Sequence, residues 1–350
     1  MPSDRNTMFA PIPIHASRHS ETHAPFTPPW LYRNGHVQTL AGLYLYAPRK
    51  TLSQAAGIRS TTGDVLLPDG DRLVYQDDCP AGWQTGDRIA LLLHGLGGSH
   101  ASPYMVRAAA QLHQRSTRTF RLDWRGCGAG AGLSRYPYHS GRSEDVAVTI
   151  THIQTLCPGS PISLIGFSLG GNVVLKLLGE PRHSLTQLVG IDRALAVCPP
   201  IDLHLSVLSM QQGWAKLYDR YFCRSCTRDV SARLRQRPDS VIPDGWFSRR
   251  PRTLYEFDET YTAPVSGFES AADYYARSSA NQFLPGISVP TLIIAAQDDP
   301  LIPFSQFRNA DYSAGTHLQT PRHGGHLGFC SFRGQHWLNQ QIAEWVVDGR

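Results

Sequence analysis

Short, fully apolar runs alternate along the chain with stretches of helical periodicity. The apolar runs predict buried strands at residues 89–93, 119–123, 161–165, 193–198 and 290–296, followed by a short strand at 317–320. Helices are predicted at residues 104–114, 144–156, 172–178 and 337–347. Ser143 is expected to cap the second of these helices. This alternation predicts an α/β fold with a mostly parallel sheet and helices on both faces.

Two segments depart from this alternation. Residues 61–78 predict a β-hairpin whose turn lies at Pro68–Asp71. Residues 201–284 contain no clear strand, and we interpret them as a helical lid inserted over the strand ends, with an ordinary helical layer as the alternative. Residues 26–350 are therefore expected to form a single domain, after a poorly ordered tail at 1–25.

Composition and charge narrow the class of protein. The chain has 350 residues, 41% of them hydrophobic, which is enough to bury a full core. Its formal net charge of +5 is only mildly basic and no nucleic-acid-binding motif occurs, so nucleic acid is not expected as a partner. No stretch approaches the roughly 18 apolar residues of a membrane span, and the N-terminus does not resemble a secretory signal. A soluble, cytoplasmic protein is expected.

Arginines and cysteines gather in the segment without strands. Arginines recur at residues 224–237 and 249–252, and we interpret them as a solvated surface, with a lipid- or acid-binding patch as the alternative. The seven cysteines are an odd number scattered along the chain, which indicates reduced thiols. Cys223 and Cys226 form a lone CxxC without a second pair, so ordinary helix cysteines are favoured over a metal or redox site.

The pentapeptide Gly-Phe-Ser-Leu-Gly at residues 166–170 follows an apolar run and precedes a helical stretch. This layout is typical of a nucleophile elbow, in which the serine sits on a strained turn. A side chain on Gly166 or Gly170 would clash with the crossing backbone. The positive end of the following helix dipole would favour a developing oxyanion. The pattern predicts Ser168 as a nucleophile.

A nucleophilic serine needs a base, and the base needs an orienting acid; on this fold they follow in the order serine, acid, histidine. Asp298 and Asp299 follow the penultimate predicted strand, and His323 and His326 follow the last one. Asp299 is preferred as the acid from its position in the turn, with Asp298 then capping the turn or the following helix. His326 is preferred because the two glycines before it let the backbone approach the serine closely.

The glycine-rich sequence at residues 94–98, His-Gly-Leu-Gly-Gly, follows the strand at 89–93. It matches the loop that donates one backbone N–H to an oxyanion hole, and we assign the amides of Leu96 and Leu169 as the two donors. A phosphate-binding loop is the alternative, but neither GxGxxG nor a Walker lysine-serine pair is present.

Several stretches resemble the YheT-like branch of the α/β-hydrolases, which includes bacterial esterases and eukaryotic membrane-anchored lipases and acyltransferases. They are residues 34–40, 123–128, 166–172, 257–258, 262–268, 273–275 and 324–329. The resemblance implies the α/β-hydrolase fold, ester hydrolysis by Ser168, Asp299 and His326, and no metal or organic cofactor. The eukaryotic relatives carry a membrane anchor that is not evident here, so a soluble ester is expected rather than one embedded in a bilayer.

These features together predict a carboxylesterase that hydrolyses short- to medium-chain acyl esters, with a small-molecule ester as partner. Acyl transfer to an alcohol by the same triad stays open, and a non-catalytic ligand-binding protein is a third, weaker alternative. The sequence carries no signal for oligomeric state. Seven aromatic residues either line an acyl pocket or form the core of the inserted segment: Trp214, Tyr218, Tyr221, Phe222, Phe268, Tyr274 and Tyr275.

Overall fold

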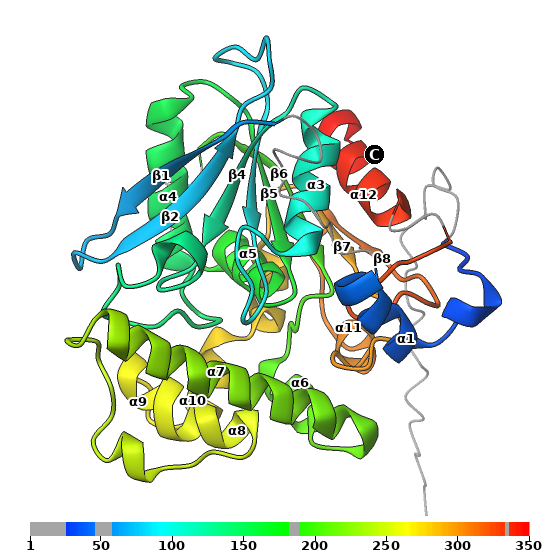
Figure 1. Ribbon diagram of the computed structural model, residues 1–350. Coiled ribbons are helices and arrows are strands. Elements are labelled where there is room, and N and C mark those ends of the chain that lie inside the picture. Colours follow the sequence, from blue (N-terminus) through cyan, green and yellow to red (C-terminus); the bar gives the residue numbers. More distant parts are fainter. Residues whose placement is uncertain (1–25, 46–57, 182–188, 333–335, 350) are drawn as a thin grey trace, which may run out of the picture.

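One sheet of eight strands organises the computed structural model, which describes residues 26–45, 58–181, 189–332 and 336–349 (Figure 1). The strand order is β1-β2-β4-β3-β5-β6-β7-β8. The strands are β1 (Ser60–Leu66), β2 (Arg72–Asp78), β3 (Ile89–Leu93), β4 (Arg118–Asp123), β5 (Ile162–Phe167), β6 (Ile191–Val197), β7 (Thr291–Ile294) and β8 (Thr316–Gln319). The β1–β2 hairpin and the β2–β4 pair are antiparallel, and every other pair is parallel, as the alternation predicts.

Helices cover both faces of this sheet (Figure 1). The helices are α1 (Gly35–Leu40), α3 (Pro103–His113), α4 (Ser143–Leu156), α5 (Leu169–Gly179), α6 (Leu203–Met210), α7 (Lys216–Gln236), α8 (Leu254–Phe257), α9 (Ala263–Ser266), α10 (Ala271–Ser278), α11 (Ser305–Arg308) and α12 (His336–Ala343). All five residues of β3 are buried, because alternate side chains enter two separate cores. Leu92 packs in the core under α3 and α12, whereas Leu91 packs in the core under α4 and α5.

Two local predictions, the cap at Ser143 and the end of the strand before Ser168, were wrong. Ser143 is the first residue of α4 rather than its cap, and its hydroxyl donates to Glu180. The strand before Ser168 extends two residues beyond Ile165, so glycine and phenylalanine of the pentapeptide end β5 and α5 begins directly at Leu169. The expected tail at residues 1–25 lies outside the described residues.

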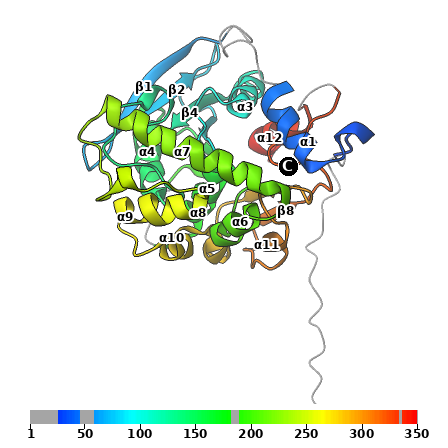
Figure 2. The same cartoon turned by 60° about the horizontal axis from the view of Figure 1, so that its bottom comes forward.

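A helical segment lies between β6 and β7, where no clear strand was expected. Helices α6 to α10 and a closing 3-10 helix at Ala280–Gly286 occupy it, and the described residues there contain no strand. Figure 1 shows these helices as a layer across one end of the sheet, and Figure 2 shows α7 running over that layer. Its role as a lid stays a prediction. None of the described helices combines the length and apolar character needed to cross a membrane.

Candidate active site

Ser168 lies on the tight turn between β5 and α5. Its backbone has φ 51° and ψ −119°, a left-handed conformation that is strained for a residue with a side chain. A Cβ on Gly166 would lie 2.3 Å from the carbonyl oxygen of Gly170, and one on Gly170 would lie 2.4 Å from that of Leu93. The two glycines are therefore required by close backbone approach, as the pentapeptide predicts.

A chain of two hydrogen bonds links the three side chains predicted as a triad. The Nε2 atom of His326 lies 2.9 Å from Ser168 Oγ, and its Nδ1 atom lies 2.8 Å from Asp299 Oδ2. The other carboxylate oxygen of Asp299 accepts the backbone N–H groups of Leu301 and Ile302. These bonds fix the orientation of the carboxylate, which can then hold His326 with Nδ1 protonated and Nε2 free to accept from the serine.

The alternative acid and base pair with each other instead. Asp298 Oδ2 lies 3.3 Å from His323 Nδ1, and Asp298 Oδ1 accepts the backbone N–H of Gly325 at 2.9 Å. Asp298 thus holds the loop that carries His326. The turn after β7 is capped by Asp299 instead, through the N–H groups of Leu301 and Ile302. The expected cap role of Asp298 was wrong. Gly325, with φ 55°, approaches the Gly35 carbonyl rather than the serine, since a Cβ there would lie 2.3 Å from that oxygen.

The loop at residues 94–98 lies directly against the nucleophile. A Cβ on Gly95 would be 3.1 Å from the Cβ of Ser168. Two tyrosines hold the loop: Tyr104 accepts the Gly95 N–H at 3.0 Å and Tyr138 accepts the Gly97 N–H at 2.9 Å. Within the described residues, the Leu96 amide between them has no acceptor. The Leu169 amide is the first of α5, where a helix offers no carbonyl acceptor. Both predicted donors are therefore available to a ligand.

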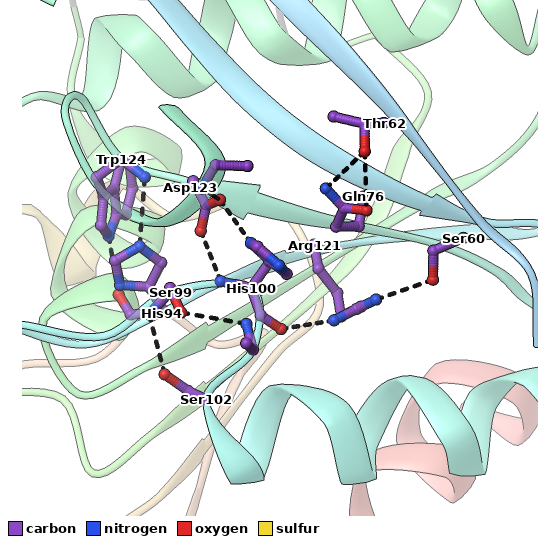
Figure 3. A network of polar contacts seen from close by, with 12 residues as sticks. Ser60, Thr62, Gln76, His94, Ser99, His100, Ser102, Arg121, Asp123 and Trp124 are labelled. Atoms are coloured by element: carbon purple, nitrogen blue, oxygen red, sulfur yellow. Dashed lines mark hydrogen bonds and ion pairs between the residues drawn. The ribbon is translucent and has the colours of Figure 1, made fainter. Parts of the chain in front are cut away.

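A buried polar network anchors both ends of this loop to β4 (Figure 3). At one end, the Trp124 indole donates to the His94 carbonyl and the Trp124 amide donates to His94 Nε2. At the other end, the buried carboxylate of Asp123 accepts the backbone N–H of His100 and lies 2.6 Å from its Nδ1. Gly128 leaves room for that carboxylate, since a Cβ there would be 2.3 Å from it. The sequence 123–128 thus positions the loop.

His94 makes the stability of this network depend on pH. Its Nε2 accepts from an amide, so Nδ1 must carry the proton and donate to the Gly95 carbonyl at 2.8 Å. Burial lowers the pKa of His94 from 6.5 to about 4. Between these pH values the unfolded chain binds a proton that the folded chain does not, so stability falls as pH falls through that window. At about 1.4 kcal/mol per pKa unit, the loss is on the order of 3 kcal/mol.

We expect urea midpoints of the wild type to decline more steeply from pH 6.5 to 4 than those of His94→Asn. The asparagine removes the titrating group, whatever its effect at neutral pH. Parallel declines in the two proteins would contradict the assignment.

The N-terminal arm, which comprises residues 26–45 and contains α1, holds the loop that carries His326. Thr39 Oγ1 accepts the backbone N–H of His326 at 2.9 Å and donates to the Gly35 carbonyl at 2.7 Å. The fully buried Gln38 donates to the Cys330 carbonyl and accepts the Cys330 N–H. A Cβ on Gly35 would overlap the carbonyl of Asp298 at 1.8 Å. In the sequence, residues 34–40 of this arm are among the stretches that resemble the family. The contacts of the arm were not predicted, because they join residues almost 300 positions apart.

Thr39→Val keeps the shape of the side chain but leaves the buried His326 N–H without its acceptor, which costs about 1–3 kcal/mol where the loop cannot adjust. We expect kcat for ester hydrolysis to fall about tenfold with KM little changed. A displaced imidazole reduces the stabilisation of the transition state more than it reduces substrate binding. Thr149→Val is the matched control, because it removes a buried hydrogen bond from the Thr149 hydroxyl to the backbone carbonyl of Asp145 on α4. Equal kcat in the two variants would contradict the positioning role.

Cys198 lies beside the acid and the base. Its Sγ forms with Asp299 and His326 the one group in the described residues whose ligand atoms lie close enough, within 4.8 Å, to hold a metal ion. Burial first, and then the negative charge of Asp299, holds the pKa of this thiol well above its usual range. A thiol kept protonated is a poor metal ligand, and the histidine and carboxylate already bond to each other. The cluster therefore fits proton transfer better than metal binding.

A small apolar cavity opens beside Ser168. It has a volume of about 100 Å³, below the roughly 300–1,000 Å³ of typical ligand pockets. Leu96 and Leu169 line it, together with residues of the inserted helices such as Val207 and Met210. A larger, polar cavity of about 320 Å³ is lined by residues including His139 and Lys176, and Ser168 is not among its lining residues. Of these two cavities in the described part of the chain, the small one is therefore the one that Ser168 lines.

The seven aromatic residues for which the sequence left pocket lining and core as alternatives lie in different surroundings. Phe222, Tyr274 and Tyr275 line the small cavity, as one alternative predicted. Phe268 lines the larger cavity, and Tyr218 packs on His36 of the arm. Trp214 and Tyr221 are exposed, so for them both alternatives were wrong. Cys223 and Cys226 are buried free thiols of α7, as expected of helix cysteines.

Known proteins share this fold and sequence pattern. Residues 90–337 match the model of the alpha/beta hydrolase family. The "Putative esterase YheT" of Escherichia coli is 30% identical over 80% of this chain and 83% of its own. A monoacylglycerol lipase of Saccharomyces cerevisiae is 26% identical over 80% of this chain, but only 61% of that protein is spanned.

A solved structure with the same fold is the Pf2001 esterase of Pyrococcus furiosus, with a TM-score of 0.56 and 17% identity over 85% of this chain and 94% of that one. At this identity the likeness concerns the fold alone. The family match, the bacterial relative and the sheet with its strained serine agree, and the chain belongs to the α/β-hydrolases, in their YheT-like branch.

Proposed function

We propose that this protein is a serine carboxylesterase. Ser168 Oγ attacks the ester carbonyl while His326 Nε2 takes its proton, and the amides of Leu96 and Leu169 hold the resulting oxyanion. His326 then gives the proton to the leaving alcohol, and water releases the acid from the acyl-enzyme by the reverse path. The observation that carries the proposal is the unbroken chain of hydrogen bonds from Ser168 through His326 to Asp299.

The cavity supports short- to medium-chain acyl groups as substrates. It is apolar and small, so it favours a modest acyl chain over a large one. The E. coli relative is named a putative esterase, and the relative of S. cerevisiae named for medium-chain acyl groups is the "Medium-chain fatty acid ethyl ester synthase/esterase 2", of which this chain spans 62%. The helical segment would act as a lid within a single unit of residues 26–350. Seven free thiols support a reducing, cytoplasmic compartment.

The test is hydrolysis of p-nitrophenyl esters from acetate to palmitate by the wild type and by Val207→Trp. We expect a maximum at short to medium length for the wild type and a shift toward acetate for the variant, because the indole fills the cavity. Leu156→Trp, on the exposed side of α4, is the control and should keep the wild-type profile. Failure of the wild type on every ester would contradict the proposal. Added ethanol would reveal acyl transfer as ethyl ester.

A further inference from the structure

Exposed apolar side chains gather on two segments of the molecule. Of the eighteen large apolar side chains that are exposed in the described part of the chain, seven lie between residues 30 and 45 and five between residues 205 and 221. Trp214, Leu217 and Tyr221 are 80%, 58% and 54% exposed, and Tyr44 and Leu45 on the arm are about as open, at 68% and 70%. Single exposed apolar residues are ordinary, but such a concentration marks an interaction surface.

The two segments meet at the active site. The ring of His36 on α1 stacks on that of Tyr218 on α7, with centroids 5.7 Å apart and planes 2° apart, and the Tyr218 hydroxyl lies 3.1 Å from His36 Nδ1. Figures 1 and 2 both show α1 beside the α6 end of α7. The same arm holds the His326 loop through Thr39. We call the exposed side chains of residues 30–45 and 205–221 the entrance face.

Positive charge lies on and beside this face. Lys216, Arg220 and Arg224 are exposed and follow one another at four-residue spacing, so they share one side of α7, next to Leu217 and Tyr221. None of the three cations forms an ion pair with a carboxylate of the described residues. Asp219, the acid in the same turns, is buried and accepts the Leu254 N–H. Arg233 is buried as well, so the arginine cluster of α7 is only partly a solvated surface.

We propose that the entrance face docks on an anionic phospholipid surface, with the opening at Ser168 turned toward the lipid. Aromatic and aliphatic side chains enter the headgroup region, and Lys and Arg beside them are attracted to anionic lipids. The face carries both kinds of group, and its exposed part on α7 carries charge of one sign. Docking goes beyond the proposed function and does not require hydrolysis, since it uses none of the triad residues.

The test is co-sedimentation of the full chain carrying Ser168→Ala with vesicles of phosphatidylcholine plus phosphatidylserine, and with vesicles of phosphatidylcholine alone. We expect binding to the anionic vesicles and much weaker binding to the neutral ones. On this background, Lys216→Glu with Arg220→Glu should weaken binding by at least about twenty-five-fold, since each cation contributes roughly fivefold. Trp214→Ser with Leu217→Ser should weaken binding to a similar extent.

The matched control is Leu66→Ser with Leu156→Ser, which removes exposed leucines from β1 and α4, on the other side of the fold. It should bind like its parent. Absence of binding to anionic vesicles, or equal losses in the control, would overturn the proposal. A stable dimer that the Trp214 and Leu217 substitutions dissociate would also overturn it, because a second copy would then cover the face. Because Ser168 is replaced by alanine in every protein of this test, failure of the esterase proposal would leave these results intact.

Discussion

Asp299→Asn should lower kcat for ester hydrolysis about ten-thousand-fold while leaving the fold intact. The reason lies in the other carboxylate oxygen, which accepts the amides of Leu301 and Ile302. In the variant these two donors keep the amide oxygen, so the NH₂ group faces His326 Nδ1. The imidazole must then accept there and carry its proton on Nε2, where it can no longer take the proton of Ser168.

Asp298→Asn is the matched control for this prediction. Its Oδ1 can still accept the Gly325 N–H as an amide oxygen, so we expect activity within a few-fold of wild type, roughly the cost of weakening one partly exposed hydrogen bond. Steady-state kinetics on one activated ester compare the two variants. A larger loss in Asp298→Asn than in Asp299→Asn would reverse the assignment of the acid.

Arg125→Leu should lower the free energy of unfolding by about 3–5 kcal/mol, because it leaves buried carboxylates without their cation. The Arg125 guanidinium binds Asp145 with two hydrogen bonds of 2.7 Å, and it also donates to Asp69 and Asp71 of the hairpin turn. Its side chain is only 3% exposed. This single residue ties the hairpin to α4.

The control is Arg72→Leu, which breaks an ion pair with Asp64 between side chains that are almost half exposed. Exposed pairs contribute at most about 1 kcal/mol, so its unfolding midpoint should stay near wild type. Chemical denaturation followed by circular dichroism measures both. Equal midpoints for the two variants would show that the Arg125 cluster contributes no more than a surface pair.

The parts of the fold that could be predicted from sequence are those in which local pattern and burial agree. The run at residues 89–93 is apolar because both faces of β3 are covered, so strand and length followed directly. The turn at Ser168 was recognisable because only glycine tolerates the observed backbone approach at its two flanking positions. Asp299 and His326 were predicted from their places after the last two strands, and their side chains lie in the hydrogen-bond chain that reaches Ser168.

The remainder depends on contacts that no local pattern encodes. Thr39 accepts the His326 N–H, and Tyr138 accepts the Gly97 N–H, only because the fold brings distant parts of the chain together. The capping prediction for Ser143 failed because α4 already begins at this residue, with Arg142 in the capping position. From sequence, an aromatic residue is equally consistent with a core position and with a pocket lining. The exposure of Trp214 and Tyr221 depends on how α6 and α7 pack, which the sequence pattern does not give.

Labelling with a fluorophosphonate tests directly whether Ser168 is the nucleophile. The adduct is measured by intact mass and located by peptide mapping, and turnover of an ester that the wild type hydrolyses is measured alongside. We expect a single adduct, on Ser168, in the wild type, and loss of both adduct and turnover in Ser168→Ala. Turnover that persists in a folded Ser168→Ala protein, or an adduct on another residue, would contradict the assignment of Ser168 as the nucleophile.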